Sequence, residues 1–250
     1  MCTEGPGTTG GAAQPAGKSQ NLAVAGDLLA TVARVQRLAQ TGGMTPTPLK
    51  ALILVCTLTP SPKPSSSDLL ARQVAEELKK HHVESQLLRV VDHDVKPGVL
   101  TDMGPGDAWP QIRKTMLESD ILVMATPIWV GHPASPAQRV LERLDAELSE
   151  TDEKGRPILF DRVALVAVVG NEDGAHHVVA ELSQGLAEVG FSLPAQGSTY
   201  WVGEAMHTVD YQDLEQTPEV TANATSIAVR NTAHLARLLR QNPYPAPPQD

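Results

Sequence analysis

Residues 49–67 read LKALILVC followed by TLTPSPKPSSS. The first part, Leu49 to Cys56, is almost continuously apolar, which is typical of a strand buried on both faces of a parallel sheet. The second part is rich in hydroxyl groups and leads into a helical pattern that begins at Ser67. A strand that delivers hydroxyls and free backbone N–H groups to a helix N-terminus forms a socket for a phosphate, which the helix dipole also stabilises.

The loop between this strand and helix limits which phosphate it can take. It has no Gly-Lys-Ser/Thr sequence and no neighbouring carboxylate for magnesium, which argues against a nucleoside triphosphate and favours a monophosphate. A simpler interpretation stays open, because Ser65-Ser66-Ser67, followed by Asp68, could serve as a helix N-cap alone. The two roles are compatible.

The composition favours one globular domain without a nucleic-acid or membrane partner. A chain of 250 residues, 41% of them hydrophobic, can bury one substantial core. Its net charge of -9 argues against electrostatic binding to nucleic acid or to an anionic membrane. The longest apolar runs, such as Val163 to Val169, are far shorter than the roughly 18 residues of a membrane-spanning helix. Two cysteines, Cys2 and Cys56, and the lack of a signal segment favour the cytoplasm.

Strand and helix patterns alternate from Leu49 onward. We expect strands at 49–56, 86–91, 121–126, 163–169 and 197–201, and helices at 67–81, 109–118, 135–148, 175–189 and 222–240. Parallel neighbours need a crossover connection of helical length, so this alternation predicts a doubly wound α/β fold, with a five-stranded parallel sheet and helices on both faces.

Three divisions of the chain follow from the same patterns. We expect residues 1–45 to form a flexible tail with a short amphipathic helix at 21–40, and Met44 is a second candidate start. Residues 46–205 form the α/β domain. Residues 206–250 hold a polar loop, the last helix and a proline-rich tail, which we expect to be extended.

The predicted sheet brings three loops to one edge. Ligands of open parallel sheets bind outside the carboxyl ends of the strands, where the strand order reverses. The loops that meet there are 57–67, 126–136 and 170–176. Two alternatives stay open: Trp129 could belong to the core or an interface, and Gly170 to Gly174 could be a turn and helix N-cap with solvated carboxylates.

These three loops, in this order, resemble those of the flavodoxin-like NAD(P)H-dependent FMN reductases and related quinone reductases. The carrying segments are Thr57 with Ser65-Ser66-Ser67, Thr126-Pro127-Ile128-Trp129-Val130-Gly131 with 138–143, and Gly170-Asn171-Glu172-Asp173-Gly174-Ala175. The resemblance covers roughly residues 49–201, and 231–236 is similar to the terminal helix of a subgroup. It implies a flavodoxin-like strand order of 2-1-3-4-5.

The resemblance also implies a set of FMN-binding residues. The phosphate would lie on Thr57, Thr59, Ser65, Ser66 and Ser67; the isoalloxazine ring would lie along Thr126, Pro127, Ile128, Trp129, Val130 and Gly131, and its other edge along Gly170, Asn171, Glu172, Asp173 and Gly174. One departure is that the family often carries Arg or Lys near the position of Thr59, whereas the only basic residue in this loop is Lys63. Phosphate binding would therefore depend on amides and hydroxyls.

The remaining chemical motifs give little evidence of function. Neighbouring helical histidines such as His176 and His177 project about 100° apart and cannot chelate one metal together, and no zinc spacing is present, so we expect no metal site. Cys56 ends an apolar strand and is expected to be buried. The match of Gly5 to Gly10 to G-x-G-x-x-G lacks a preceding strand, and G-x-S-x-G is absent.

We expect an FMN-dependent oxidoreductase that takes hydride from NAD(P)H and passes electrons to a small acceptor such as a quinone or free flavin. Such chemistry needs no catalytic side chain, because the flavin carries it. The alternatives are a flavodoxin-type one-electron carrier for a protein partner and a non-redox binding domain. The resemblance also implies a homodimer or homotetramer, in which 207–217 or the last helix supplies a wall to a neighbouring site. It indicates neither the acceptor nor a preference between NADH and NADPH.

Overall fold

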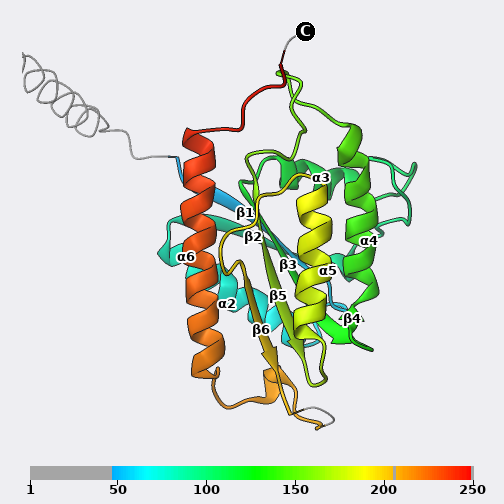
Figure 1. The fold of residues 1–250 in the computed structure, drawn as a ribbon. Helices are drawn as coiled ribbons and strands as arrows, with labels where there is room; N and C mark the ends of the chain where they lie inside the picture. The colour runs from blue at the N-terminus through cyan, green and yellow to red at the C-terminus, as the bar shows by residue number, and fades with distance from the viewer. Residues whose placement is uncertain (1–46, 205–206, 249–250) are drawn as a thin grey trace, which may run out of the picture. The chain divides into compact units, whose positions relative to one another are not determined.

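Five parallel strands form the centre of the protein in a computed structural model, which describes residues 47–204 and 207–248 (Figure 1). They are β1 (Leu49–Val55), β2 (Val83–Arg89), β3 (Ile121–Trp129), β5 (Val163–Gly170) and β6 (Ser198–Val202). Their order is β2-β1-β3-β5-β6, and the two-residue β4 (His132–Pro133) pairs with β3. Numbered along the chain, the parallel strands have the predicted order 2-1-3-4-5, so the flavodoxin-like α/β fold is confirmed.

Helices cover both faces of this sheet. Figure 1 shows α3 (Trp109–Leu117), α4 (Ser135–Leu144) and α5 (Ala175–Glu188) on one side and α2 (Ser66–Lys80) and α6 (Glu219–Gln241) on the other. Each side has its own buried cluster of apolar side chains. Alternate residues of a strand enter different clusters: Leu52 and Leu54 of β1 face α3 to α5, whereas Ile53 faces α2 and α6. This two-sided burial explains the nearly continuous apolar strand sequences.

Most element boundaries lie within two residues of the predicted ones, but those of β2, β3, α4 and α6 differ by more. β2 begins at Val83 and not at Gln86, because residues 84–86 of this edge strand are exposed and polar and so lack the apolar pattern. α4 ends at Leu144, where the chain tightens into a 3-10 turn, and not at the predicted Leu148, which is exposed. α6 begins at Glu219, before the predicted start at Ala222.

The third strand is longer than predicted and turns back on itself. Residues 127–129, expected in a loop, continue β3, which pairs with β5 as far as Pro127. The following turn places Trp129 opposite His132 in a short antiparallel hairpin with β4. A proline such as Pro127 normally indicates the end of a strand, because it has no N–H to donate to a neighbouring strand. Here Pro127 is tolerated because it forms the last pair with β5, where β3 leaves the sheet.

Three other expectations concern the N-terminal tail, membrane-spanning helices and the division of the chain. The tail and short helix predicted within residues 1–45 lie outside the described ranges, and the unit from Pro48 to Asp250 is described by itself. None of the helices in the described ranges has an apolar stretch of the length needed to cross a lipid bilayer. The predicted division at 46–205 and 206–250 stays a prediction, although α6 packs its apolar face on the same sheet.

Candidate functional site

A cavity of about 330 Å³ lies at the carboxyl ends of the parallel strands. It occupies the switch point of the sheet, between the loops that follow β1 and β3, where open α/β folds bind ligands. Its size falls at the lower end of the range of roughly 300–1,000 Å³ that is common for small-molecule sites. Its lining residues are Thr57, Leu58, Thr59, Pro64, Ser65, Ser66, Ser67, Pro127, Ile128, Trp129, Val169, Gly170, Asn171, Trp201, Asp210, Tyr211 and Gln212.

The structure brings together most of the residues that the sequence proposes for a flavin site. Those that line the cavity are Thr57, Thr59, Ser65, Ser66, Ser67, Pro127, Ile128, Trp129, Gly170 and Asn171. Those that do not line it are Thr126, Val130, Gly131, Glu172, Asp173 and Gly174. Trp129 is exposed, so of its two alternatives the core is excluded.

The residues outside the lining have contacts of their own. Thr126 is fully buried, and its Oγ1 accepts a hydrogen bond of 3.1 Å from the backbone N–H of Ala134. Glu172 accepts a hydrogen bond of 2.9 Å from the backbone N–H of Val130. Gly174 has a φ of +126°, and a Cβ there would lie 2.9 Å from the Cα of Gly131, so only glycine allows this close approach. These contacts position the hairpin at the edge of the cavity.

The hydroxyl-rich loop after β1 folds around its own side chains. Ser65 donates a hydrogen bond of 3.0 Å to Oγ1 of Thr57, which also accepts one of 3.2 Å from the backbone N–H of Thr59. The Ser65 hydroxyl is the N-cap of α2 and accepts from the N–H of Asp68. The capping interpretation is therefore confirmed, and the same residue lines the cavity. The first N–H groups of α2 have no acceptor within the helix, which suits an anion at this end.

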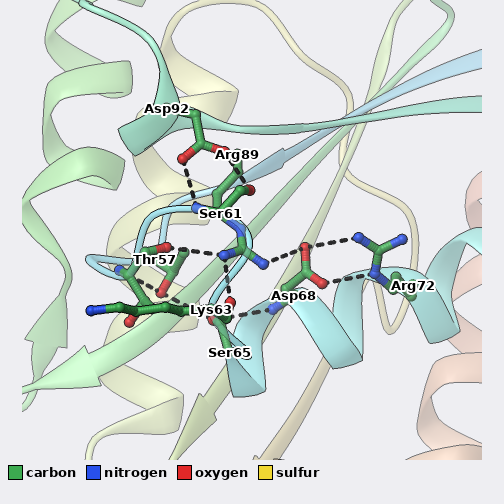
Figure 2. A network of polar contacts seen from close by, with 9 residues as sticks. Thr57, Ser61, Lys63, Ser65, Asp68, Arg72, Arg89 and Asp92 are labelled. Atoms are coloured by element: carbon green, nitrogen blue, oxygen red, sulfur yellow. Dashed lines mark hydrogen bonds and ion pairs between the residues drawn. The ribbon is translucent and has the colours of Figure 1, made fainter.

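A basic residue that sequence reasoning missed supports this loop from β2. The guanidinium of Arg89 donates hydrogen bonds to the backbone oxygens of Thr59 (3.2 Å) and Lys63 (2.8 Å) and pairs with Asp68 at 3.1 Å (Figure 2). The Arg89 side chain is buried, so this pairing is shielded from solvent. Nothing in the sequence near β2 marks Arg89 as part of the loop, because it lies 30 residues from Thr59 along the chain.

The outer part of the loop is held by Asp92, just beyond β2. Its carboxylate accepts hydrogen bonds from the Ser61 backbone N–H at 2.8 Å and the Ser61 hydroxyl at 2.5 Å (Figure 2). The hydroxyl bond from Ser61 is the main cause that lowers the pKa of Asp92. The charged form of Asp92 therefore holds the loop in place at neutral pH.

A segment before α6 closes the cavity and was also missed. The 3-10 turn η3 (Tyr211–Asp213) attaches to α2 through the Tyr211 hydroxyl, which donates to Gln73 at 2.6 Å, and the Gln212 N–H, which donates to Ser66 at 3.3 Å. Asn171 donates a hydrogen bond of 3.0 Å to Asp210 across the cavity rim. Burial raises the pKa of Tyr211. The sequence shows this segment only as a polar loop, and the structure places it in the lining of the cavity of its own chain. The prediction that 207–217 or the last helix supplies a wall to a neighbouring site stays a prediction.

Two buried polar atoms test whether a phosphorylated flavin fits. The Ser67 hydroxyl and the Gln212 side-chain oxygen are both buried, line the cavity, and have no hydrogen-bond partner within the described part of the chain. Buried polar atoms are normally paired, so each calls for a ligand group. A phosphate oxygen can accept from Ser67, and a flavin offers ring N–H and ribityl hydroxyl donors for Gln212. The hydrogen-bonding groups of the cavity therefore fit a phosphorylated flavin.

The cavity offers few side chains for acid–base catalysis. Among its described lining residues, only Asp210 and Tyr211 are titratable. Cys56 precedes the lining residue Thr57 but is itself fully buried, as predicted, and burial raises the pKa of its thiol. The site is thus suited to hold a group that brings its own chemistry.

The strand order and the placement of this cavity define the class: a flavodoxin-like α/β protein with a ligand cavity at the switch point. A family model described as NADPH-dependent FMN reductase matches residues 49–207. The chain belongs to the NADPH-dependent FMN reductase family. Membership implies flavin-dependent oxidoreduction in a flavodoxin-like protein.

Similar proteins extend this assignment. The chain is 36% identical over 208 residues to the 8-demethyl-8-aminoriboflavin-5'-phosphate synthase of Streptomyces davaonensis, covering 78% of this chain and 80% of that protein. The crystal structure of RosB with a bound intermediate, 8-demethyl-8-formylriboflavin-5'-phosphate, superposes with a TM-score of 0.72 at 33% identity, covering 78% of this chain and 82% of that chain. A flavone reductase shares the fold, with a TM-score of 0.58 and 14% identity over 79% of this chain and 66% of that one.

One relative matches over only part of its length. The chain is 35% identical over 199 residues, or 77% of this chain, to a Mycobacterium bovis protein described as the divalent metal cation transporter MntH. The match covers 29% of that protein, so its name describes a much larger molecule.

Proposed function

We propose that this protein binds FMN in the switch-point cavity and uses it to pass electrons from NAD(P)H to a small acceptor such as a quinone or free flavin. The observation that carries the proposal is the unpartnered Ser67 hydroxyl, buried in the cavity at the N-terminus of α2. Family membership supports the flavin, and the cavity chemistry supports its phosphate.

Each part of the cavity would have a distinct role in holding the cofactor. Thr57, Thr59 and Ser65 to Ser67, with the first N–H groups of α2, would bind the phosphate. Pro127 to Trp129 and Gly170 to Asn171 would lie along the ring, and Gln212 would accept from it or from the ribityl chain. Bound flavin supplies the electron transfer itself, accepting hydride and releasing electrons singly or in pairs. The chain's residues orient the flavin and restrict water.

The test is to purify the full chain, record its flavin spectrum, and follow NADPH and NADH oxidation with quinone and free flavin as acceptors. The proposal predicts a yellow protein, or a colourless one that binds added FMN, and oxidation of at least one nicotinamide. Binding of FMN without direct oxidation of either would favour the flavodoxin-type carrier. Failure to bind FMN would favour a non-redox domain and reject the proposal.

A second candidate function treats the flavin as reactant. A relative at 36% identity and a solved structure at 33% identity carry names that refer to modified riboflavin phosphates. In each comparison the match covers about four fifths of the other protein. The same cavity would then hold riboflavin-5'-phosphate while its ring substituent is changed. The mass of flavin extracted after incubation with air and a mixture of primary amines separates the two: an unchanged mass supports a cofactor, and an altered mass supports a substrate.

We also propose that the protein is a homodimer or homotetramer. Trp129 and Val130 are exposed apolar residues at the edge of the cavity, which is the kind of surface that a subunit contact covers. Light scattering on the purified chain gives the mass directly. A monomer at micromolar concentration would reject this part.

A further inference from the structure

Three potential metal ligands from two separate elements meet beside the candidate site. They are His132 of β4 and His177 and Glu181 of α5, and their ligand atoms all lie within 4.8 Å of one another. Nδ1 of His132 lies 3.3 Å from Oε2 of Glu181, and Nε2 of His177 lies 3.4 Å from the same oxygen. The two imidazole rings are nearly perpendicular, with centroids 4.9 Å apart. The flavin proposal uses none of these side chains.

The backbone, and not the side chains themselves, brings the cluster together. His177 and Glu181 are one helical turn apart, so they share a face of α5. The turn before His132 has positive φ at Val130 (52°) and Gly131 (76°), as in a tight type I′ hairpin. The close approach of Gly131 to Gly174 then sets this hairpin against the start of α5. His132 is therefore placed next to the helix by rigid elements.

We propose that His132, His177 and Glu181 form a binding site for a divalent transition-metal ion of the zinc type. Zinc binds imidazole nitrogen and carboxylate oxygen at about 2.0–2.1 Å in a tetrahedron, which separates neighbouring ligand atoms by roughly 3.3 Å. The two separations that end on Glu181, 3.3 and 3.4 Å, match two edges of such a tetrahedron, and all three ligand atoms lie within 4.8 Å of one another. Two imidazoles and one carboxylate suit zinc better than calcium or magnesium, which prefer oxygen ligands.

The exposure of the site determines what the ion could do. Both histidines are exposed and Glu181 is half-buried, so water can reach the ion and fill the remaining coordination position. A bound ion would join β4 to α5 and so fix the hairpin that carries Trp129 at the cavity edge. The site is thus a clamp on one wall of the cavity. This inference does not depend on the nature of the flavin chemistry.

The competing explanation is a set of ion pairs without a metal, and a matched variant separates the two. His176 neighbours His177, but its Nε2 contacts the Tyr200 hydroxyl at 2.8 Å and lies outside the cluster. We would treat the full, untagged chain with a chelator and titrate it with Zn²⁺ by calorimetry and with Co²⁺ by its visible spectrum. The parent protein should bind one ion per chain, with a tetrahedral Co²⁺ spectrum.

The variants then decide the outcome. His177→Ala and Glu181→Gln should weaken binding roughly tenfold or more, since loss of even an outer-shell partner costs that much, whereas His176→Ala and Glu188→Gln should leave it unchanged. Zn²⁺ should raise the thermal unfolding temperature of the parent and of His176→Ala but not of His177→Ala. Because the substituted side chains are exposed or half-buried, the variants should fold. Absence of Zn²⁺ binding, or binding that survives His177→Ala and Glu181→Gln, overturns the proposal.

Discussion

The guanidinium of Arg89 at the end of β2 lies 3.1 Å from the carboxylate of Asp68 in the first turn of α2. This pair joins two elements that flank the hydroxyl-rich loop, and Arg89 also donates to two backbone oxygens within that loop. A buried cation therefore supports the hydroxyl-rich loop from a neighbouring strand. The resemblance implies a basic residue in the loop itself, near Thr59, whereas here Arg89 contacts the loop from β2.

Removal of Arg89 should loosen the loop. Its side chain is only 7% exposed, so Arg89→Met removes the buried partner of Asp68 and the donor to two loop carbonyls, at a cost of about 3 kcal/mol in the free energy of unfolding. FMN affinity should fall as well, because the loop loses its support. Arg72 pairs with the same carboxylate but is 63% exposed, so the control Arg72→Met should cost less than about 1 kcal/mol. Urea unfolding measures both, and equal losses would contradict a special role for Arg89.

Removal of the Ser67 hydroxyl should affect binding and stability in opposite directions. Ser67→Ala eliminates an unpaired buried polar atom, so the ligand-free protein should be as stable as the parent or more stable by about 1 kcal/mol. The dissociation constant for FMN should rise roughly tenfold, since a hydrogen bond to a charged phosphate is lost. Fluorescence titration and urea unfolding measure the two effects.

A serine outside the cavity provides the control for this variant. Ser119 is buried and donates a hydrogen bond of 2.8 Å to the backbone oxygen of Thr115. Ser119→Ala should lower stability by about 1 kcal/mol and leave FMN binding unchanged. If Ser67→Ala behaves in the same way, then Ser67 has a structural role only.

The ion pair of Asp107 with Arg143 should make stability depend on acid pH. Both side chains are fully buried and lie 2.8 Å apart. Burial alone would raise the pKa of Asp107, but backbone N–H bonds from Met103 and Trp109, together with Arg143, outweigh it and lower the pKa from 3.8 to about 2. A lowered pKa stabilises the fold above the unfolded value, and this contribution disappears as pH falls from about 4 to about 2.

Arg143→Met tests this coupling. At neutral pH the variant should lose about 3 kcal/mol in the free energy of unfolding, because the Asp107 charge stays buried without its partner. Its stability should also fall less steeply between about pH 4 and about pH 2. These are the pKa values of Asp107 in the unfolded and in the folded protein. Arg139, an exposed residue one turn earlier on α4, is the control, and Arg139→Met should retain the acid dependence of the parent. Identical pH profiles for all three proteins would refute the prediction.

The hairpin tip carries backbone strain that a substitution should relieve. Val130 has a φ of 52° and is 86% exposed, so a β-branched residue occupies a left-handed conformation with little packing in return. Val130→Asn should raise stability by about 1 kcal/mol, because Asn-Gly is the favoured pair of a type I′ turn. Val220, 82% exposed near the start of α6, is a control that should give no gain on substitution with Asn. Thermal unfolding measures the difference, and a less stable Val130→Asn would show that the strain is absent.

Local sequence patterns determined the α/β fold and the first loop of the site. Strands such as β1 and β5 are buried on both faces and therefore read as apolar runs, and the helices between them carry one apolar stripe. These periodicities arise from neighbouring residues, so no distant contact is needed to detect them. The same holds for Ser65, whose capping role follows from its place between loop and helix.

Only the tertiary structure decided which distant residues contact one another, in the site and outside it. Arg89 reads as a strand residue and Arg143 as part of a charged helix surface, yet both are buried against partners far along the chain. Gln212 reads as part of a polar loop, and His132 lies 49 residues from Glu181. Such contacts depend on how strands are ordered and how the connecting segments pack. A charged or amide side chain has no periodicity that would reveal its partner, so its role follows from the packing of the whole chain.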